Sequence, residues 1–344
     1  MPGLQLKPDV AVDMGTDNTR IYVKNKGIVV NESSVLVRKG NGKKAPIIAI
    51  GDSCEEFIGR ANSEYRIVHP IRSGIIVDYE NAQIMLHYYM TKAIGSWFHL
   101  KPRIVVTIPG NVNAVQRQSV INVMEKIGAR QIFVVEQAFA SGLGTGLQVY
   151  EPQASFVVDI GSGTTEIALI SMGGIVSSLS IQAAGTMLND LIGQHLKKRY
   201  GIDVTERATE QIKFDLTDVR EEKNIDRIVV VRGRDMATGM PFTQDVKTSE
   251  ICKAIKPALM EIIGGIRRIL EMTPPELCID ILKNGIYLTG GSSLLPGLDA
   301  LIVTELGIPV SVAREAGECT ILGAGYLSDH FDMLSNRTEL LKSK

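Results

Sequence analysis

Two short segments, DMGTDNTR at Asp13 to Arg20 and DIGSGTTE at Asp159 to Glu166, decide the fold of this chain. Each follows an apolar run typical of a buried strand, begins with an aspartate and continues into a turn rich in glycine and threonine. We expect each strand to end at its aspartate, so that the carboxylate lies at the strand tip. Glycine lets the backbone approach a phosphate, and hydroxyls and backbone N–H groups can donate to it.

The second segment begins 146 residues after the first (159 − 13). This spacing suggests two similarly built lobes that could close on one phosphorylated ligand. A third glycine turn, TGGSSLLPGLD at Thr289 to Asp299, follows an apolar strand-like run and is expected to contact a phosphate or a nucleoside. One glycine turn alone is more often simple turn geometry than a ligand contact. Three such turns in this order and spacing are specific.

The composition is typical of a soluble nucleotide-handling protein. The chain has 344 residues, 44% hydrophobic and 22% charged, which is enough for two substantial cores. Lys and Arg number 37 against 38 for Asp and Glu, so the net charge of −1 gives no electrostatic argument for nucleic acid. We expect a cytoplasmic protein, because there is no 18-residue apolar span and the start, MPGLQLKPD, lacks the features of a signal peptide. The scattered Cys and His residues do not favour zinc or a disulfide, so any metal should be a hard cation held by carboxylate and phosphate.

Strand-like and helix-like patterns alternate along both halves of the chain. In the first half we predict strands at 10–12, 20–23, 27–30, 34–37, 103–108 and 132–135, and helices at 81–93 and 112–127. In the second half we predict strands at 155–158, 167–170, 174–180 and 285–288, helices at 187–200 and 249–272, and a small strand-rich subdomain at 220–248. This alternation predicts an α/β fold, with sheets covered by helices on both faces.

The three turns resemble, in order, the phosphate 1, phosphate 2 and adenosine motifs of the actin, sugar kinase and heat-shock chaperone ATPase superfamily. Further segments, among them HPIRSGIIVDYE, KPRIVVTIPGNV and TPPELCIDILKNG, are similar to the MreB family of bacterial actins, which organise cell-wall synthesis and rod shape. The resemblance implies an actin-like ATPase fold: two similar lobes, each with a mixed sheet flanked by helices, and two small inserts around a nucleotide cleft. Lobe I would comprise 1–37, 69–150 and 318–344 with an insert at 38–68, and lobe II 151–187 and 251–317 with an insert at 188–250.

The resemblance also implies a site for ATP or ADP with Mg²⁺. Asp13 and Asp159 would hold the metal through its water molecules, which suits an ion that keeps several waters; the alternative is that they cap a turn or helix. Glu136 aligns with the residue that positions the attacking water, which makes Glu136, Asp159 and Asp13 the expected catalytic residues. The structural alternative for Glu136 is an acid favoured at a helix N-terminus.

Nucleotide contacts are implied for three further groups of residues. The phosphates would be surrounded by Gly15, Thr16, Asp17, Asn18, Gly161, Ser162, Gly163 and Thr164. Gly290, Gly291 and Ser292 would back the adenosine, with Gly185 and Asn189 at the phosphate or ribose edge. Glu210 and Lys213 are about one helical turn apart and could reach the same face to bracket adenine and ribose; the alternative is a surface ion pair.

Several positions depart from the family pattern. Gln137 and Ala138 stand where a second acid and a proline are common, and Thr186 stands where an aspartate follows Gly185. Ser162 replaces a usual glycine and keeps a donor, and Asp17 replaces a small residue. The sequence therefore predicts ATP binding more firmly than ATP hydrolysis.

The segment GSWFHLKP contains the only tryptophan and predicts a membrane contact. In some relatives the matching loop dips into the inner membrane, and Trp97, Phe98 and Leu100 suit an interface where aromatic rings lie at headgroup level. The alternative is a hydrophobic plug on the lobe's own core. One loop per subunit would bind weakly, and repetition along a filament would strengthen binding by avidity.

The expected function is a nucleotide-gated filament protein that hydrolyses ATP slowly and assembles head to tail at the inner face of the cell membrane. Its expected partners are other copies of itself, the membrane surface, and membrane proteins of wall synthesis or organelle positioning, and not nucleic acid. One alternative is a filament that positions an organelle or plasmid. A small-molecule kinase would need an acid for a second substrate, for which no distinct candidate is found, and a chaperone ATPase would need a peptide-binding domain after the cleft.

Overall fold

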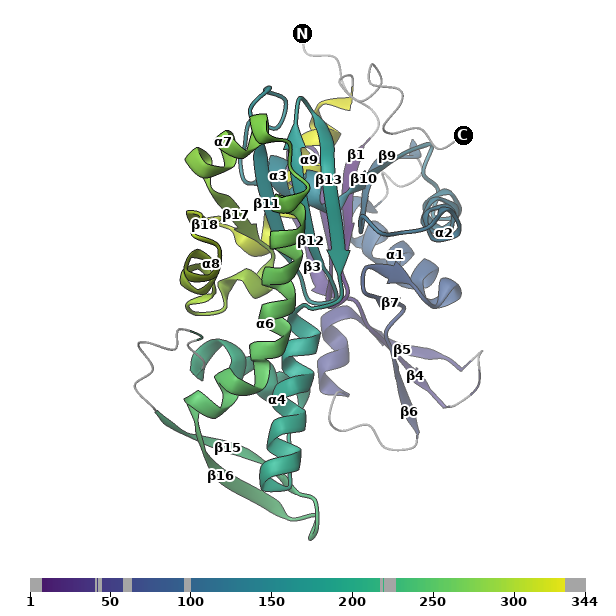
Figure 1. Cartoon of the computed structure of the whole chain (residues 1–344). Coiled ribbons are helices and arrows are strands. Elements are labelled where there is room, and N and C mark those ends of the chain that lie inside the picture. The colour runs from purple at the N-terminus through teal and green to yellow at the C-terminus, as the bar shows by residue number, and fades with distance from the viewer. Residues whose placement is uncertain are drawn as a thin grey trace. The chain divides into compact units, whose positions relative to one another are not determined.

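The computed structural model describes residues 8–40, 42, 45–57, 64–95, 100–216, 219 and 227–331. The chain divides into two compact units, Met1–Gln148 with Glu318–Lys344, and Val149–Gly317 (Figure 1). Within the described ranges, no helix has both the length and the hydropathy that crossing a membrane requires.

The first unit is built on a five-stranded mixed sheet with the order β10-β9-β1-β2-β3. The central strand β1 (Asp9–Met14) runs parallel to β9 (Arg103–Ile108), and β9 runs parallel to β10 (Gln131–Glu136). On the other side, β2 (Asn18–Val23) and β3 (Gly27–Ser33) follow as antiparallel neighbours. All six residues of β1 are buried, as expected for a central strand covered on both faces.

Helices cover both faces of this sheet, and alternate residues of β1 point to opposite layers. Val10, Val12 and Met14 belong to the core that includes α1 (Tyr79–Ile94) and α2 (Ala114–Lys126). Ala11 belongs to the core on the other face, with α3 (Gln137–Gly144) and α9 (Cys319–Asp329).

Helix α9 returns the chain to the first unit and packs on α3 through glycine. A Cβ on Gly144 would overlap the carbonyl oxygen of Cys319, and a Cβ on Gly323 would overlap that of Ala140. The Tyr22 hydroxyl donates to Asp329 Oδ2 at 2.9 Å, and burial together with this carboxylate raises the pKa of Tyr22 to about 12. The last described helix is therefore an integral part of the first unit.

The first insert is a three-stranded antiparallel sheet with the order β5-β4-β6. Its strands are β4 (Leu36–Lys39), β5 (Ile47–Ile50) and β6 (Tyr65–Val68), and a 3-10 helix, η1 (Gly51–Glu56), follows β5. A small core of its own includes Val37, Ala49 and Cys54. The short hairpin of β7 (Ile71–Arg72) and β8 (Ile75–Ile76) connects it to α1.

The second unit repeats the sheet plan of the first, with the order β13-β12-β11-β17-β18. The central strand β11 (Ser155–Ile160) pairs antiparallel with β12 (Thr165–Ser171), which pairs with β13 (Gly174–Ile181). On its other side lie β17 (Ile286–Thr289) and β18 (Val310–Val312), both parallel. The duplication inferred from the two motifs is therefore present in the sheet order.

Helices and a second insert complete the second unit. The long helix α6 (Thr248–Glu271) extends from the sheet alongside α4 (Gly185–Tyr200) to the strands β15 (Ile228–Asp235) and β16 (Pro241–Lys247) (Figure 1). These strands form a sheet with β14 (Ile202–Asp203), and α5 (Glu206–Gln211) leads into a π-helical turn, η3 (Ile212–Leu216). The second unit also contains α7 (Pro275–Asn284), the 3-10 helix η5 (Gly291–Leu294) and α8 (Leu298–Leu306).

The predicted α/β class with mixed sheets flanked by helices is confirmed, and the differences are local. The strand predicted at 34–37 is wrong in its first half, because β3 ends at Ser33 and β4 begins at Leu36. Helix α2 begins at Ala114 rather than Val112, because Asn113 is its N-cap and accepts from Gln116 N. The two prolines after α6 end that helix, but Pro275 also begins α7, which was not predicted.

The close contact of α3 with α9 predicts a strong effect of one methyl group. Gly323→Ala should lower the free energy of unfolding by about 3 kcal/mol or more, because overpacking costs roughly 1–3 kcal/mol and the obstacle here is backbone. Urea denaturation followed by circular dichroism measures this change. The matched control is Gly264→Ala in α6, where a Cβ meets nothing within 4 Å. The control should gain up to about 1 kcal/mol, since alanine favours the helix; equal stability of the two variants would contradict the contact.

Candidate functional site

Asp13 lies at the carboxyl end of β1 and is buried, with 5% exposure. Thr107, at the same register on β9, donates its hydroxyl to Asp13 Oδ1 at 2.7 Å. On the other side, Arg20 of β2 brings Nη1 to 3.6 Å from Asp13 Oδ2. Both neighbouring strands thus orient the carboxylate and compensate its charge.

The turn that follows Asp13 is closely held by its surroundings. A Cβ on Gly15 would lie 2.5 Å from the carbonyl oxygen of Asn18, so only glycine fits without rearrangement. The hydroxyl of Ser34 donates to the Gly15 carbonyl at 2.8 Å, and the backbone N–H of Gly74 donates to Thr16 Oγ1 at 3.1 Å. Since Thr16 accepts from Gly74, its own hydroxyl hydrogen can be given to another acceptor.

Glu136 reaches the same edge of the first sheet. It is the last residue of β10, which runs parallel to β9, and it precedes α3 as its N-cap. Its side chain makes no capping hydrogen bond to α3, but its place at the start of that helix fits the structural alternative of an acid favoured at a helix N-terminus. A Cβ on Gly74 would lie 2.5 Å from Pro109 Cγ and 3.8 Å from Gln137 Nε2, which links the turn at Thr16 to the start of α3. Asp13, Thr16 and Glu136 therefore share the carboxyl edge, where open α/β sheets bind ligands.

In the second unit, the predicted phosphate turn, α4 and the third glycine turn meet. Gly161 N donates to Thr164 O at 3.0 Å and closes the turn. The first residues of α4 hold it from outside, since Gly185 N donates to Gly161 O at 3.0 Å and Thr186 N to Ser162 O at 2.8 Å. Thr186, which stands where the family pattern has an aspartate, therefore contacts the turn with its backbone N–H. Ser292 Oγ also donates to the Gly161 carbonyl, at 2.9 Å.

The N-terminus of α4 gives this turn an electrostatic preference for anions. The helix has 16 residues, and its positive end lies against the turn at Gly161. One turn further along, Asn189 is 6% exposed, and among the described residues its Oδ1 has no hydrogen-bond partner. A buried oxygen of this kind fits a donor on a bound ligand, such as a ribose hydroxyl.

The two glycines of the third turn have different surroundings. Gly290 has a φ of +82°, and a Cβ there would lie 2.5 Å from Asp159 Oδ1 and overlap the Ile160 carbonyl. Gly291 faces open space, with nothing within 4 Å of its Cβ position. The third turn therefore touches Asp159 directly and leaves room beside it.

The Glu210 and Lys213 side chains have opposite environments. Glu210 is exposed near the end of α5, whereas Lys213 is 2% exposed in the π-helical turn η3. A surface ion pair, the alternative interpretation, does not fit a lysine this deeply buried.

In the predicted membrane segment, Leu100 is exposed, and Trp97 and Phe98 lie outside the described residues.

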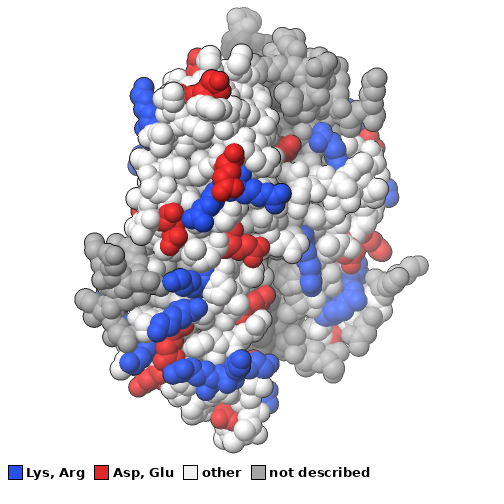
Figure 2. Space-filling model, in the orientation of Figure 1, with Lys and Arg blue, Asp and Glu red and all other residues white. Residues whose placement is uncertain are grey.

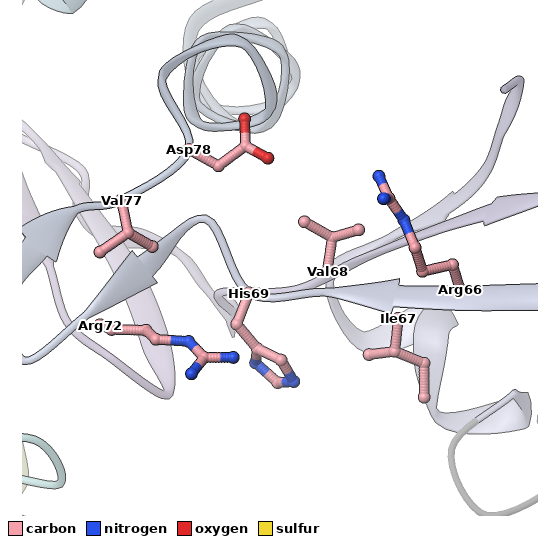
Figure 3. Close-up of a pocket in the computed structure, with 7 residues that line it drawn as sticks. All are labelled: Arg66, Ile67, Val68, His69, Arg72, Val77 and Asp78. Atoms are coloured by element: carbon pink, nitrogen blue, oxygen red, sulfur yellow. The ribbon is translucent and has the colours of Figure 1, made fainter. Parts of the chain in front are cut away.

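The first unit also contains a groove of about 400 Å³ that no sequence pattern predicted (Figure 3). Figure 3 shows the side chains of His69 and Arg72 next to each other. Burial and the charge of Arg72 lower the pKa of His69, while Asp17 opposes this shift. The groove is lined by Arg66, Ile67, Val68, His69, Arg72, Val77 and Asp78. It contains none of the predicted site residues.

Known proteins resemble this chain over nearly its whole length. The MreB/Mbl protein family matches residues 7–336. The chain belongs to the MreB/Mbl family. A curated MreB/Mbl relative, the cell shape-determining protein Mbl of Bacillus subtilis strain 168, is 36% identical over 329 residues, which cover 96% of this chain and 98% of Mbl. The cell shape-determining protein MreB of Escherichia coli K12 is 35% identical over 328 residues, covering 94% of each chain.

Solved structures of the MreB type have the same fold. The crystal structure of Spiroplasma citri MreB5 bound to AMPPNP matches with a TM-score of 0.89 and 29% identity, covering 98% of this chain and 99% of that one. The same protein bound to ADP matches with a TM-score of 0.88 and 30% identity, covering 96% and 98%. The MamK double helical filament shares the fold, with a TM-score of 0.77 at 21% identity over 94% and 99% of the two chains.

The adjacent glycines of the third turn provide a matched pair for testing the site. Gly290→Ala should lower the free energy of unfolding by about 2–4 kcal/mol, because it combines a left-handed backbone with an overlap against Ile160. Gly291→Ala should stay within about 0.5 kcal/mol of the unchanged protein, since it projects into open space. Thermal unfolding of both variants measures the difference. Equal losses would show that Gly290 is not packed against the strand tip at Asp159.

Proposed function

We propose that this chain is a cell-shape filament protein that binds ATP or ADP with Mg²⁺, hydrolyses ATP slowly and polymerises head to tail at the inner face of the membrane. The observation that carries the proposal is the repeated sheet, in which each unit has a buried aspartate at the tip of its central strand beside a glycine turn. Membership of the MreB/Mbl family and the cell shape-determining names of its relatives support this function.

The second unit has the features that a nucleotide requires. The turn at Gly161 to Thr164 and the start of α4 suit the phosphates. The space at Gly291 and the Asn189 oxygen, which has no hydrogen-bond partner among the described residues, suit the nucleoside. The nucleotide-bound forms of the S. citri relative support the same assignment.

Asp13 and Asp159 are proposed to hold Mg²⁺ through its waters. Both are buried oxygen ligands at strand tips, which suits a hard cation that takes few protein ligands. When bound, the ion would neutralise phosphate charge during phosphoryl transfer. The protein's own contribution is to position the phosphates with the two glycine turns.

Glu136 is proposed to orient the water that attacks the γ-phosphate. Its place at the carboxyl edge of the first sheet, close to the turn at Thr16, supports this role. Gln137 and Ala138 supply no second acid next to it, which agrees with slow turnover.

Assembly and membrane contact complete the proposal. Head-to-tail contacts give open filaments unless the rotation between subunits closes a ring, and MamK, which shares the fold, is known as a double helical filament. The exposed Leu100, next to Trp97 and Phe98 in sequence, supports a weak membrane contact that filaments multiply. On the face in Figure 2, basic side chains gather over α4 and β15–β16 with acidic ones among them. The net charge of −1 gives no electrostatic argument for nucleic acid as the partner.

Sedimentation tests the filament proposal. The protein should pellet with ATP and remain in solution without nucleotide, and anionic liposomes should carry down an additional fraction only when filaments are present. Replacing both Trp97 and Phe98 with serine should remove the liposome-bound fraction and leave ATP-dependent pelleting intact. A monodisperse monomer under every condition would contradict the proposal, and unchanged liposome binding by the double variant would contradict the membrane contact.

Replacing Glu136 tests the hydrolysis step separately from assembly. Glu136→Ala should slow phosphate release about 100-fold, the lower end of the usual contribution of a positioned acid or base. ATP-dependent pelleting should persist, because the phosphate turns are unchanged. Glu125→Ala, an exposed acid on α2, is the matched control and should release phosphate normally. An unaltered rate in Glu136→Ala would show that another group positions the water.

A further inference from the structure

The groove of Figure 3 lies beside the outer edge of the first insert sheet. That sheet has the order β5-β4-β6, and β4 is the only described strand that pairs with β6. Four consecutive residues, 66–69, line the groove together with Arg72, Val77 and Asp78, whereas none of the described residues of β4 does. The groove of about 400 Å³ therefore runs along the edge of β6 that no described strand covers, and its size is typical of a ligand site.

The register of β6 determines which of its backbone groups face away from β4. Gly40 N donates to Glu64 O at 2.6 Å, which makes residues 40 and 64 a hydrogen-bonded pair at the end of the ladder. Such pairs alternate along antiparallel strands, so Arg38 and Arg66, the second pair from there, also exchange hydrogen bonds. Ile67 follows Arg66, and its N–H and C=O point away from β4. Within the described residues these two groups have no hydrogen-bond partner.

The side chains along this edge alternate between the two sides of the strand. Figure 3 shows Arg66 and Val68 on one side and Ile67 and His69 on the other. All four residues of β6 are half-buried, so neither side of the strand is fully closed off from solvent. An extended peptide beside β6 would match this pattern, because its own side chains also project alternately to the two sides.

The lining of the groove is basic. Arg66 and Arg72 carry its positive charge at neutral pH, since burial and Arg72 lower the pKa of His69. The one acid among the described lining residues, Asp78, caps α1 and accepts from Asn81 N at 3.2 Å and from Asn81 Nδ2 at 2.7 Å. Arg66 Nε is buried and has no hydrogen-bond partner in the part of the chain that the structure describes. An acidic side chain would supply both an acceptor and a compensating charge.

We infer that this groove is a docking site for an extended acidic segment of a partner protein, which adds as a strand to the outer edge of β6. Backbone pairing with Ile67 would provide affinity, and acidic side chains next to Arg66 and Arg72 would provide specificity. Val77, which is 58% exposed, offers an apolar contact between the charges. The edge of a second copy does not fit, because arginines would then face arginines. Docking at this edge needs no nucleotide, so it is independent of the proposed function.

Fluorescence anisotropy of labelled peptides mixed with the full chain tests this docking. The probe is a peptide of alternating glutamate and valine with acetylated and amidated ends, and a lysine–valine peptide of the same length is its charge-reversed control. The chain should bind the glutamate peptide and not the lysine peptide. Arg66→Ala and Arg72→Ala should each weaken binding about tenfold, as expected for the loss of a hydrogen bond between charged groups. Arg130→Ala, which removes an exposed arginine of the same unit, should bind normally.

Two changes to the backbone separate strand addition from simple attraction of charge. N-methylation of alternate peptide residues, in either of the two possible phases, keeps the charge but removes backbone donors, so one phase should abolish binding. Ile67→Pro removes the outward N–H of β6 and leaves the ladder to β4 intact, a position that proline tolerates in edge strands. This variant should lose binding, whereas Ile67→Ala, which loses the same side-chain packing but keeps the N–H, should retain it. The methylated peptides give an answer even where a variant does not fold.

Charge reversal gives the positive counterpart of these losses. The double variant with Arg66→Glu and Arg72→Glu should lose the glutamate peptide and gain the lysine peptide. Three results would overturn the docking site. The first is that the glutamate peptide does not bind, and the second is that both N-methylated peptides bind as well as the unmodified one. The third is that inorganic phosphate displaces the probe as effectively as unlabelled peptide does, because the groove would then be a simple anion pocket.

Discussion

The structure of each unit depends on an aspartate buried at the end of its central strand. A buried carboxylate is costly unless neighbouring groups donate to it or compensate its charge. For Asp13 these groups come from the flanking strands β9 and β2 at the same register. The sheet order is therefore more than a way to cover a core, because it brings Thr107 of β9 to Asp13, a partner that no local segment could supply.

The same constraint explains the composition of the turns around the strand tips. The chain must reverse immediately after Asp159, and the third turn must pass its carboxylate so closely that Gly290 has no room for a side chain. The turn at Gly161 leaves its carbonyl free to accept from Gly185 and Ser292. Glycine and small hydroxyl residues are thus required by close backbone approach, whether or not a ligand is bound.

Much of this arrangement could be predicted from sequence, because the two motifs are local and repeated. Strand type, helix type and the duplicated α/β plan follow from hydrophobic periodicity within about ten residues. The Thr107 partner of Asp13 could not be found this way, because it is 94 residues away and its role depends on strand pairing. Lys213 was predicted as a ligand contact, but its burial in the π-helical turn η3 follows from tertiary packing that no local sequence pattern reveals. Pro275 begins α7, which the hydrophobic pattern did not predict, although proline suits the first turn of a helix.

Arg20 and Glu166 occupy the eighth position of the two quoted motifs, so the signal for them was present in the sequence. A hairpin with a four-residue turn between paired strands places its first and eighth residues opposite each other, as the register confirms for both units. Duplicated hairpins that keep the aspartate but exchange a cation for an acid have different electrostatic preferences. The hairpin with Arg20 places a positive charge beside its aspartate, and the hairpin with Glu166 places a second buried carboxylate opposite its own aspartate. The two repeats therefore differ at the position where each strand-tip aspartate meets the neighbouring antiparallel strand, although the order of strands around that aspartate is the same.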